Sequence, residues 1–159
     1  MRSGFGEEHP YCDAGQNFFI LLFIVTWATD TFWLNVSTYL MDYFHWLIRV
    51  SLTLIFVTLG IYLGREAHKM VFEEASSSPQ VIEQGVFSYV RHPLYLGVLL
   101  TMIGLFFWSF SLFTLCVWLG LFIFYNHMAT FEEEDLTRIL GEKYKKYQRR
   151  VGKWFPKVI

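Results

Sequence analysis

Between Leu94 and Asn126 the sequence contains no charged residue, and this run limits the possible folds more than any other feature. It is too long for one straight membrane helix of about 20 residues, so we expect a helical hairpin with its tip near Ser109 and Ser111. Over the whole chain 54% of residues are hydrophobic and 17% are charged, whereas soluble domains have roughly 25% charged residues. We therefore predict an all-α integral membrane helical bundle that forms a single domain over residues 1–159.

Two further membrane spans are expected before the hairpin. The first covers residues 18–34 and is interrupted by Asp30, and the second covers about residues 47–63. Residues 35–46 between them are rich in Tyr and Trp, which suit the headgroup region, so this stretch is interpreted as an interfacial turn. Residues 73–79 are small, polar and turn-prone, and they predict a loop. The total is about four transmembrane helices.

The positions of Lys and Arg predict the orientation of the spans. With four spans, nearly all of the basic residues fall on one side of the membrane, and only Arg49 lies towards the other. Those on the common side are Arg2, Arg65, Lys69, Arg91, Arg138, Lys143, Lys145, Lys146, Arg149, Arg150, Lys153 and Lys157. By the positive-inside tendency, both termini of this multi-pass protein are expected to be cytoplasmic.

A C-terminal amphipathic cytosolic helix is predicted after the last span. Its apolar positions recur at helical spacing: Leu136, Leu140, Tyr144, Tyr147 and Val151. The opposite face is basic and suits anionic lipid headgroups. The acidic run 132–135 is expected at the beginning of this helix, where the helix dipole favours negative charge.

Polar side chains gather at the entrance of the predicted hairpin. Arg91 and His92 directly precede Pro93, which is well suited to the first position of a helix. Charged groups at a membrane surface are costly unless they lie at the interface or bind something. The hairpin should bring them near Glu132 and Glu133, although the sequence separates the two pairs widely. A ligand with both an amine and a carboxylate would suit such a site.

These residues form the two halves of a longer pattern. The first half, Gly-x-x-x-Tyr-Val-Arg-His-Pro-x-Tyr, consists of Gly85, Tyr89, Val90, Arg91, His92, Pro93 and Tyr95. The second half consists of Glu132, Glu133, Leu136, Leu140, Gly141, Tyr144 and Tyr147. The ordered pair, over about residues 80–157, resembles the signature of the isoprenylcysteine carboxyl methyltransferase and phospholipid methyltransferase superfamily. The chain has Val151-Gly152-Lys153 where that family often has Val-Pro-Arg.

The resemblance implies a membrane methyltransferase that uses S-adenosylmethionine. Residues 1–72 would then supply the first two spans, and residues 80–157 would form the cofactor-binding core. The implied cofactor-binding residues are Gly85, Tyr89, His92, Pro93, Tyr95, Leu96, Glu132 and Glu133. Of these, Glu132 and Glu133 would hold the ammonium group. The implied catalytic residues are Arg91, Glu133 and Arg150. A lipid-like acceptor would enter from the bilayer and offer a prenylcysteine-type carboxylate, a phospholipid amine or a thiol.

Two alternatives to a methyltransferase remain at this point. Sterol reductases of related membrane architecture share an Arg-His-x-x-Tyr element but use NADPH, and the sequence shows no obvious basic pocket for the 2′-phosphate. A non-catalytic membrane scaffold is the other alternative. The net charge of −1 gives no electrostatic reason to expect a nucleic-acid partner, and no metal-ligand spacing is present. The sequence assigns no role to Asp30, His45 or His127, and it leaves the acceptor, the catalytic base, the oligomeric state and the cellular membrane open.

Overall fold

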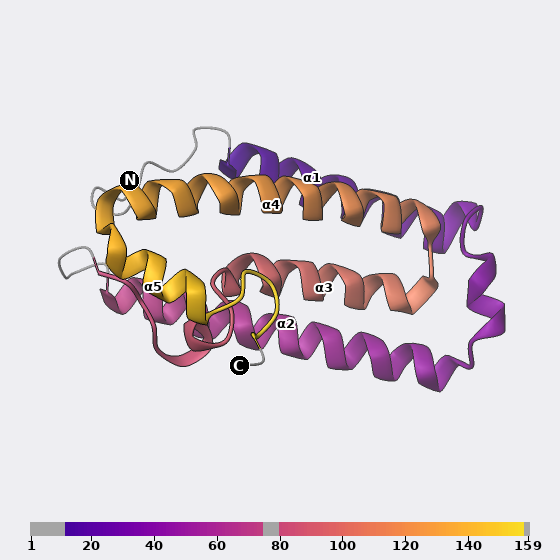
Figure 1. The fold of residues 1–159 in the computed structure, drawn as a ribbon. Helices are drawn as coiled ribbons and strands as arrows, with labels where there is room; N and C mark the ends of the chain where they lie inside the picture. The colour runs from indigo at the N-terminus through magenta and orange to yellow at the C-terminus, as the bar shows by residue number, and fades with distance from the viewer. Residues whose placement is uncertain (1–11, 75–79, 158–159) are drawn as a thin grey trace.

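The computed structural model describes residues 12–74 and 80–157, and these residues form a helical bundle (Figure 1). Its four long helices lie side by side: α1 (Cys12–Thr29), α2 (Trp46–Glu74), α3 (Pro93–Ser109) and α4 (Leu112–Leu140). Shorter elements connect or follow them: η1 (Asp30–Leu34, a π-helix), η2 (Tyr39–Tyr43), η3 (Gly85–Ser88) and α5 (Glu142–Arg150). The predicted all-α membrane bundle is therefore confirmed.

Three stretches in the described part are long and apolar enough to cross a membrane: Asp13–Leu34, Trp46–Phe72 and Leu112–Leu140. The remaining predicted span, the first arm of the hairpin, is α3, a shorter apolar helix of 17 residues. At 1.5 Å per residue α3 extends about 26 Å, less than the roughly 30 Å of a bilayer core. Its ends are set by Pro93 at the start and by Phe110, whose left-handed backbone (φ 50°) ends the helix.

The predicted hairpin tip at Ser109 and Ser111 is confirmed. Phe110 lies between α3 and α4, and Ser111 is the N-cap residue of α4. The Ser111 hydroxyl accepts a hydrogen bond from the Thr114 N–H at 3.4 Å. Such a side-chain cap pairs an N–H group that the first turn of a helix leaves unpaired.

Four predicted boundaries differ from the structure. The first span was expected to begin at Phe18, but α1 begins at Cys12. The second span was expected to end near Leu63, but α2 continues to Glu74; residues 75–79 of the predicted loop lie outside the described residues. The acidic run 132–135 lies well inside α4 and not at a helix start, because no helix-breaking residue separates it from the span. The single C-terminal helix is instead two helices, because Gly141 adopts a positive φ of 57° and ends α4.

The apolar pattern of the C-terminal region nevertheless predicted the right contacts. Tyr144, Tyr147 and Val151 are buried together, and Leu136 and Leu140 pack against them from the end of α4. Val81, from the segment before η3, completes this cluster. The apolar face of α5 therefore packs on the protein itself.

Glycines allow α2 and α3 to pack at close range. A Cβ atom on Gly60 would lie 2.5 Å from the Gly97 carbonyl oxygen, and one on Gly97 would lie 2.8 Å from the Gly60 carbonyl oxygen. Contacts this short exclude any side chain, as in other small-residue interfaces between membrane helices. The second buried group of apolar residues joins the other helices: Phe23 of α1, Leu99 and Met102 of α3, and Leu121 and Tyr125 of α4.

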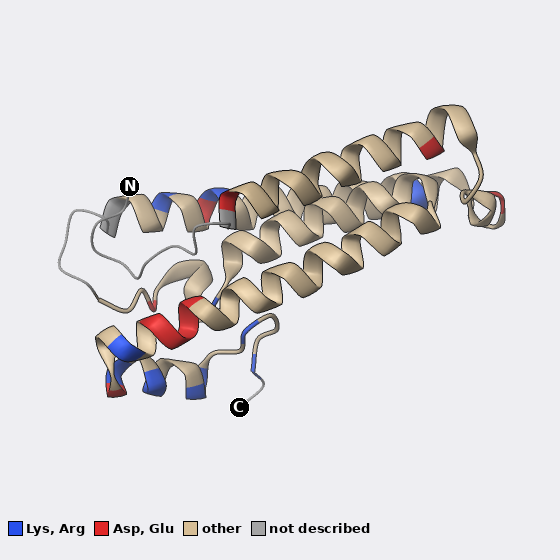
Figure 2. Cartoon of the chain, turned by 90° about the horizontal axis from the view of Figure 1, so that it is seen from above, with Lys and Arg blue, Asp and Glu red and all other residues tan. Residues whose placement is uncertain are grey.

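The charged residues are concentrated at one end of the bundle. Figure 2 shows most of the Lys, Arg, Asp and Glu residues at the end where α5 lies, which we call the charged end. At the opposite end, Asp30 makes hydrogen bonds that connect the first span to the hairpin tip. The middle of the bundle between these ends is nearly free of charge, as the uncharged run predicts.

Candidate functional site

Two pairs of charged residues meet at the charged end, where α3 begins beside α4. His92 is the N-cap residue of α3, and its Nε2 lies 2.9 Å from Oε1 of Glu133. Its Nδ1 lies 3.5 Å from Oε2 of Glu132. The Tyr95 hydroxyl, one turn into α3, donates a hydrogen bond to Glu132. The hairpin thus brings together residues that the sequence places about forty positions apart, as predicted.

Arg91 connects three segments of the chain. Its Nε donates to Oε1 of Glu133 at 2.9 Å, and its Nη1 donates to the carbonyl oxygens of Gln148 and Val151 at 3.1 and 2.6 Å. Its backbone N–H donates to the Gly152 carbonyl oxygen at 2.9 Å. The Arg91 side chain is only 10% exposed. Arg91 therefore holds the start of α3, the middle of α4 and the end of α5 in one arrangement.

The two glutamates differ in exposure and in partners. The Glu133 side chain is 12% exposed and is shared by Arg91, His92 and the Gln148 amide, which donates at 3.4 Å. The Glu132 side chain is 37% exposed, and among the described residues its polar partners are Tyr95 and His92. Of the two carboxylates, Glu132 is therefore the one that an incoming cation can reach.

Aromatic rings continue the site towards the middle of the bundle. The ring of Tyr95 stacks on His92 with centroids 5.9 Å apart and on Tyr125 with centroids 4.6 Å apart. Trp154 lies beside His92 at 6.0 Å and beside Phe122 at 5.6 Å. A cluster of carboxylates next to aromatic faces suits a cationic ligand, because both attract positive charge.

The segment after α5 covers one side of the site, and sequence reasoning missed its contribution. The Trp154 indole N–H donates to the Asn126 side-chain oxygen at 3.1 Å. The Lys153 ammonium donates to the Asn126 carbonyl oxygen at 3.1 Å and to the Thr130 hydroxyl at 2.8 Å. Gly152 leaves room for the turn, because a Cβ atom there would lie 1.8 Å from the Phe155 carbonyl oxygen. The sequence did contain one sign of this contribution, because residues 151–153 depart there from the Val-Pro-Arg that is frequent in the family it resembles.

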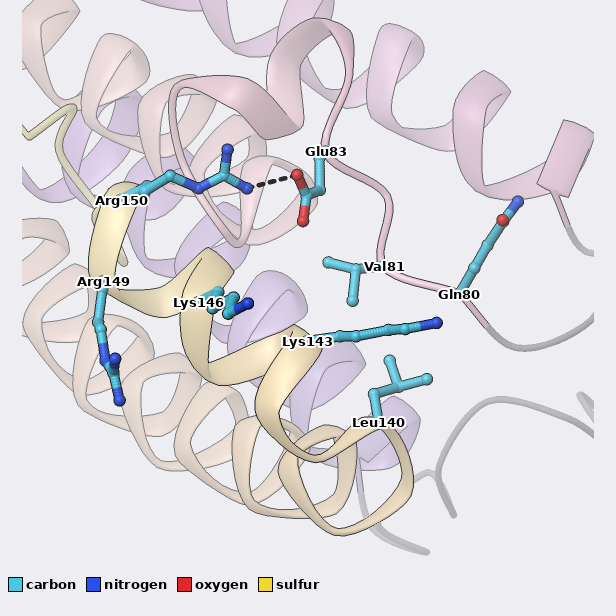
Figure 3. Close-up of a pocket in the computed structure, with 8 residues that line it drawn as sticks. All are labelled: Gln80, Val81, Glu83, Leu140, Lys143, Lys146, Arg149 and Arg150. Carbon is cyan, nitrogen blue, oxygen red and sulfur yellow. Dashed lines mark hydrogen bonds and ion pairs between the residues drawn. The ribbon is translucent and has the colours of Figure 1, made fainter.

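Not all of the predicted site residues lie in this cluster. The Arg150 side chain lies at another face of α5, 57% exposed, and donates to Glu83 at 2.5 Å (Figure 3). Tyr89 is 65% exposed. Gly85, at the start of η3, has a positive φ of 52°, a backbone conformation that favours glycine, which accounts for this residue without a cofactor contact. Pro93 is fully buried at the start of α3 beside the half-buried Leu96.

The two carboxylates beside His92 favour its charged form. Burial lowers the pKa of His92, but the hydrogen bonds and negative charges of Glu132 and Glu133 outweigh burial, so its pKa is raised above the ordinary value of 6.5. This favours the protonated imidazole at neutral pH. In its protonated form His92 can donate hydrogen bonds from both ring nitrogens but cannot accept a proton.

The stability of the protein should therefore depend on pH through His92. A raised folded-state pKa means that the stabilisation is fully present below the unfolded value of 6.5 and is lost as the pH rises through the raised value. We expect the difference in melting temperature between wild type and His92→Asn to be largest below the unfolded value of 6.5 and to shrink as the pH rises through the raised folded-state pKa. The matched control is His127→Asn, an exposed histidine of α4. Melting curves in detergent measure this difference. If the difference between wild type and His92→Asn does not vary with pH, the raised pKa of His92 is contradicted.

Comparison with known proteins shows a family match over most of the bundle. A sequence model of the phospholipid methyltransferase family matches residues 47–143. The chain is 32% identical over 146 residues to methanethiol S-methyltransferase of Crocosphaera subtropica, covering 89% of this chain and 48% of that protein. It is 28% identical to protein-S-isoprenylcysteine O-methyltransferase of Schizosaccharomyces pombe, covering 64% of this chain and 47% of that protein.

A second isoprenylcysteine O-methyltransferase, from Tribolium castaneum, is 27% identical and covers 70% of this chain and 42% of that protein. The chain spans about half the length of the curated relatives it matches. No solved structure gives a significant match. The region matched by the family model includes Arg91, His92, Glu132 and Glu133 but ends before most of α5.

Proposed function

Because the chain belongs to the phospholipid methyltransferase family, we propose that it is a membrane enzyme that transfers a methyl group from S-adenosylmethionine to a small acceptor. The observation that carries this proposal is the meeting of Glu132 and Glu133 with Arg91 and His92 beside an aromatic stack. We also propose that the charged end faces the cytosol, because Lys and Arg gather there.

The chemistry of the cluster fits the proposed cofactor. S-adenosylmethionine supplies a methyl group on a positively charged sulfur. Glu132 is the exposed carboxylate and is suited to bind the ammonium group. The half-buried rings of Tyr95 and Trp154, both beside His92, offer aromatic surface for a cation or an adenine ring, and the fully buried Tyr125 supports Tyr95 from behind. Glu133 fits less well as a direct ligand, because Arg91 and His92 already use its carboxylate.

The residues of the chain would act mainly by placing the reactants. Methyl transfer is an in-line displacement, so holding donor and acceptor in line and excluding water contribute most of the rate. Arg91 fixes the relative positions of α3, α4 and α5, and Glu133 orients Arg91 and His92. The apolar ends of α3 and α4 next to Tyr125 keep water from that side. We propose positioning roles for Arg91 and Glu133, and no catalytic role for Arg150.

We propose a small thiol as the acceptor, in preference to a carboxylate or an amine. The thiol would lose its proton to water and react as the thiolate, so that its sulfur gains the methyl group as the bond between that group and the sulfonium sulfur breaks and S-adenosylhomocysteine leaves. A carboxylate acceptor needs a cation, but the Arg91 guanidinium is already bound by Glu133 and by two carbonyl oxygens. The similarity to methanethiol S-methyltransferase also extends over more of the chain than the similarities to the isoprenylcysteine enzymes.

Incubation with methyl-labelled S-adenosylmethionine and one acceptor of each class tests whether a thiol is the preferred acceptor. We expect more labelled thioether than labelled ester or labelled amine.

The NADPH alternative needs a direct test, because the structure does contain a basic pocket, lined by Lys143, Lys146, Arg149 and Arg150. Calorimetric titration of the purified protein in detergent compares S-adenosylhomocysteine with NADPH. We expect heat of binding for S-adenosylhomocysteine alone. Binding of NADPH alone would favour a reductase, and binding of neither would favour a scaffold.

Glu132→Gln should weaken the binding of S-adenosylhomocysteine about tenfold or more, because one charge-assisted contact to its ammonium group is lost. Glu134→Gln is the matched control, because Glu134 is exposed and adjacent in α4. Both affinities come from the same calorimetric titration. If Glu132→Gln binds as tightly as the control, the ammonium group is not held by Glu132.

A further inference from the structure

A basic pocket lies on the charged end, at a face of α5 other than the one that holds Arg91. It has a volume of about 720 Å³, within the range of small-molecule sites. Its lining comes from the segment before η3 and from α5 with the end of α4 (Figure 3): Gln80, Val81, Glu83, Leu140, Lys143, Lys146, Arg149 and Arg150. Figure 3 shows Lys143 extending across the gap towards Gln80, between Val81 and Leu140.

The charges of this pocket are unbalanced. Four cationic side chains line it together with a single carboxylate, Glu83, which is paired with Arg150 at 2.5 Å. Within the described residues, Lys143, Lys146 and Arg149 form no ion pair, although all three are exposed. The neighbouring Lys145 differs, because Glu142 binds it at 2.9 Å. Figure 3 shows Lys143 and Lys146 on the side of α5 that carries the pocket, whereas the Arg149 side chain points away from them. Two unpaired lysines beside one pocket favour the binding of an anion with several oxygen atoms.

The position of α5 brings this pocket close to the membrane. In Figure 1, α5 turns back from the end of α4 and runs towards the bundle. Just after α5, Trp154 packs against Phe122, which lies in the membrane-spanning part of α4. The last turn of α5, which carries Arg149 and Arg150, therefore lies nearer the headgroup layer than its first turn. At that level the most abundant anions are the phosphate groups of anionic lipids.

We propose that the pocket between residues 80–83 and α5 binds the phosphate headgroup of an anionic lipid. Lys143 and Lys146 bind the phosphate oxygens, and Val81 and Leu140 contact the glycerol carbons. The neighbouring face of α5 carries Tyr144 and Tyr147, and the carbonyl groups of Gln148 and Val151 hold Arg91, so a bound lipid stabilises the helix on which the candidate site depends. The binding itself does not depend on the proposed methyl transfer.

Native mass spectrometry of the full chain in neutral detergent tests this proposal. Phosphatidylglycerol is titrated against the wild type and two variants that each remove two cations from the charged end. The pocket variant is Lys143→Gln/Lys146→Gln, and the matched control is Arg138→Gln/Lys145→Gln, whose side chains do not line the pocket. We expect about tenfold weaker lipid binding or more in the pocket variant, and less than about twofold change in the control.

Further ligands identify the source of the phosphate. Phosphatidylcholine should bind the wild type more weakly than phosphatidylglycerol, because its headgroup has no net charge. Inorganic phosphate and glycerol 3-phosphate should not displace phosphatidylglycerol at equal concentration. The proposal is overturned by equal loss of binding in both variants, which would indicate general surface charge, or by unchanged binding in the pocket variant. Displacement by free phosphate would assign the pocket to a soluble ligand instead. Circular dichroism of both variants confirms that they are folded.

Discussion

Replacing Glu133 by alanine is expected to lower the free energy of unfolding by about 3–5 kcal/mol, the usual cost of removing one partner of a buried ion pair. Glu133 is bound by Arg91, His92 and Gln148, and the side chains of Arg91 and Glu133 are 10% and 12% exposed. Without Glu133, Arg91 and protonated His92 are left next to each other with less compensating charge. Equilibrium unfolding in mixed detergent micelles measures the loss.

The adjacent Glu134→Ala should change the free energy of unfolding by less than about 0.5 kcal/mol, because Glu134 is exposed on the same helix. A double variant, Glu133→Leu with Arg91→Met, should lose less stability than the sum of the two single variants, because neither charge is then left unpaired. If the double variant instead loses the sum of the two single losses in unfolding free energy, the Arg91–Glu133 ion pair does not link the start of α3 to α4. Glu133→Ala should also abolish the binding of S-adenosylhomocysteine, because the site loses its arrangement.

Replacing Asp30 by alanine is expected to cost about 3 kcal/mol or more, since an unpaired buried polar group typically costs about 1–3 kcal/mol. Asp30 is 1% exposed. Its carboxylate accepts hydrogen bonds from the backbone N–H groups of Val36 and Ser37 at 2.9 and 3.2 Å. It also accepts from the hydroxyls of Ser37 and Ser111 at 2.5 and 2.6 Å. The Asp30 side chain thus connects the turn after the first span to the tip of the α3–α4 hairpin through hydrogen bonds.

Asp42→Ala is the matched control, because Asp42 is an exposed carboxylate in η2 at the same end of the bundle. Asp30→Asn should lose less than Asp30→Ala, because the amide keeps one acceptor oxygen. The same detergent unfolding measurement applies to all three variants. A loss for Asp30→Ala no larger than that for Asp42→Ala would mean that the network does not stabilise the bundle.

The sequence predicted the helices well where a local signal marks them. Pro93 marked the start of α3, and the serines at 109 and 111 marked the tip. The end of α2 and the break at Gly141 were missed. In α2 the helix continues into a polar region where hydropathy gives no boundary, and a single glycine does not reveal that its φ is positive.

The candidate site was predicted in part. The sequence predicted that Arg91 and His92 lie near Glu132 and Glu133, because the two ends of a hairpin are neighbours whatever the details of its packing. It did not separate the roles of the two glutamates, since adjacent residues on a helix look equivalent in sequence. Only their rotation relative to α3 makes Glu133 the buried anchor and Glu132 the accessible carboxylate. Asp30 had no assigned role, because its partners Val36, Ser37 and Ser111 carry no recognisable pattern.

By itself, the sequence determined that this protein is a helical membrane bundle with its polar chemistry at one end, because burial in a bilayer depends on local composition and length. The tertiary structure decided which charges are paired, that α5 holds Arg91 with one face and forms a basic pocket with another, and that Asp30 connects two turns. Those outcomes depend on helix rotation and on contacts between distant segments. Periodicity identifies the faces of a helix but not the partner that each face meets.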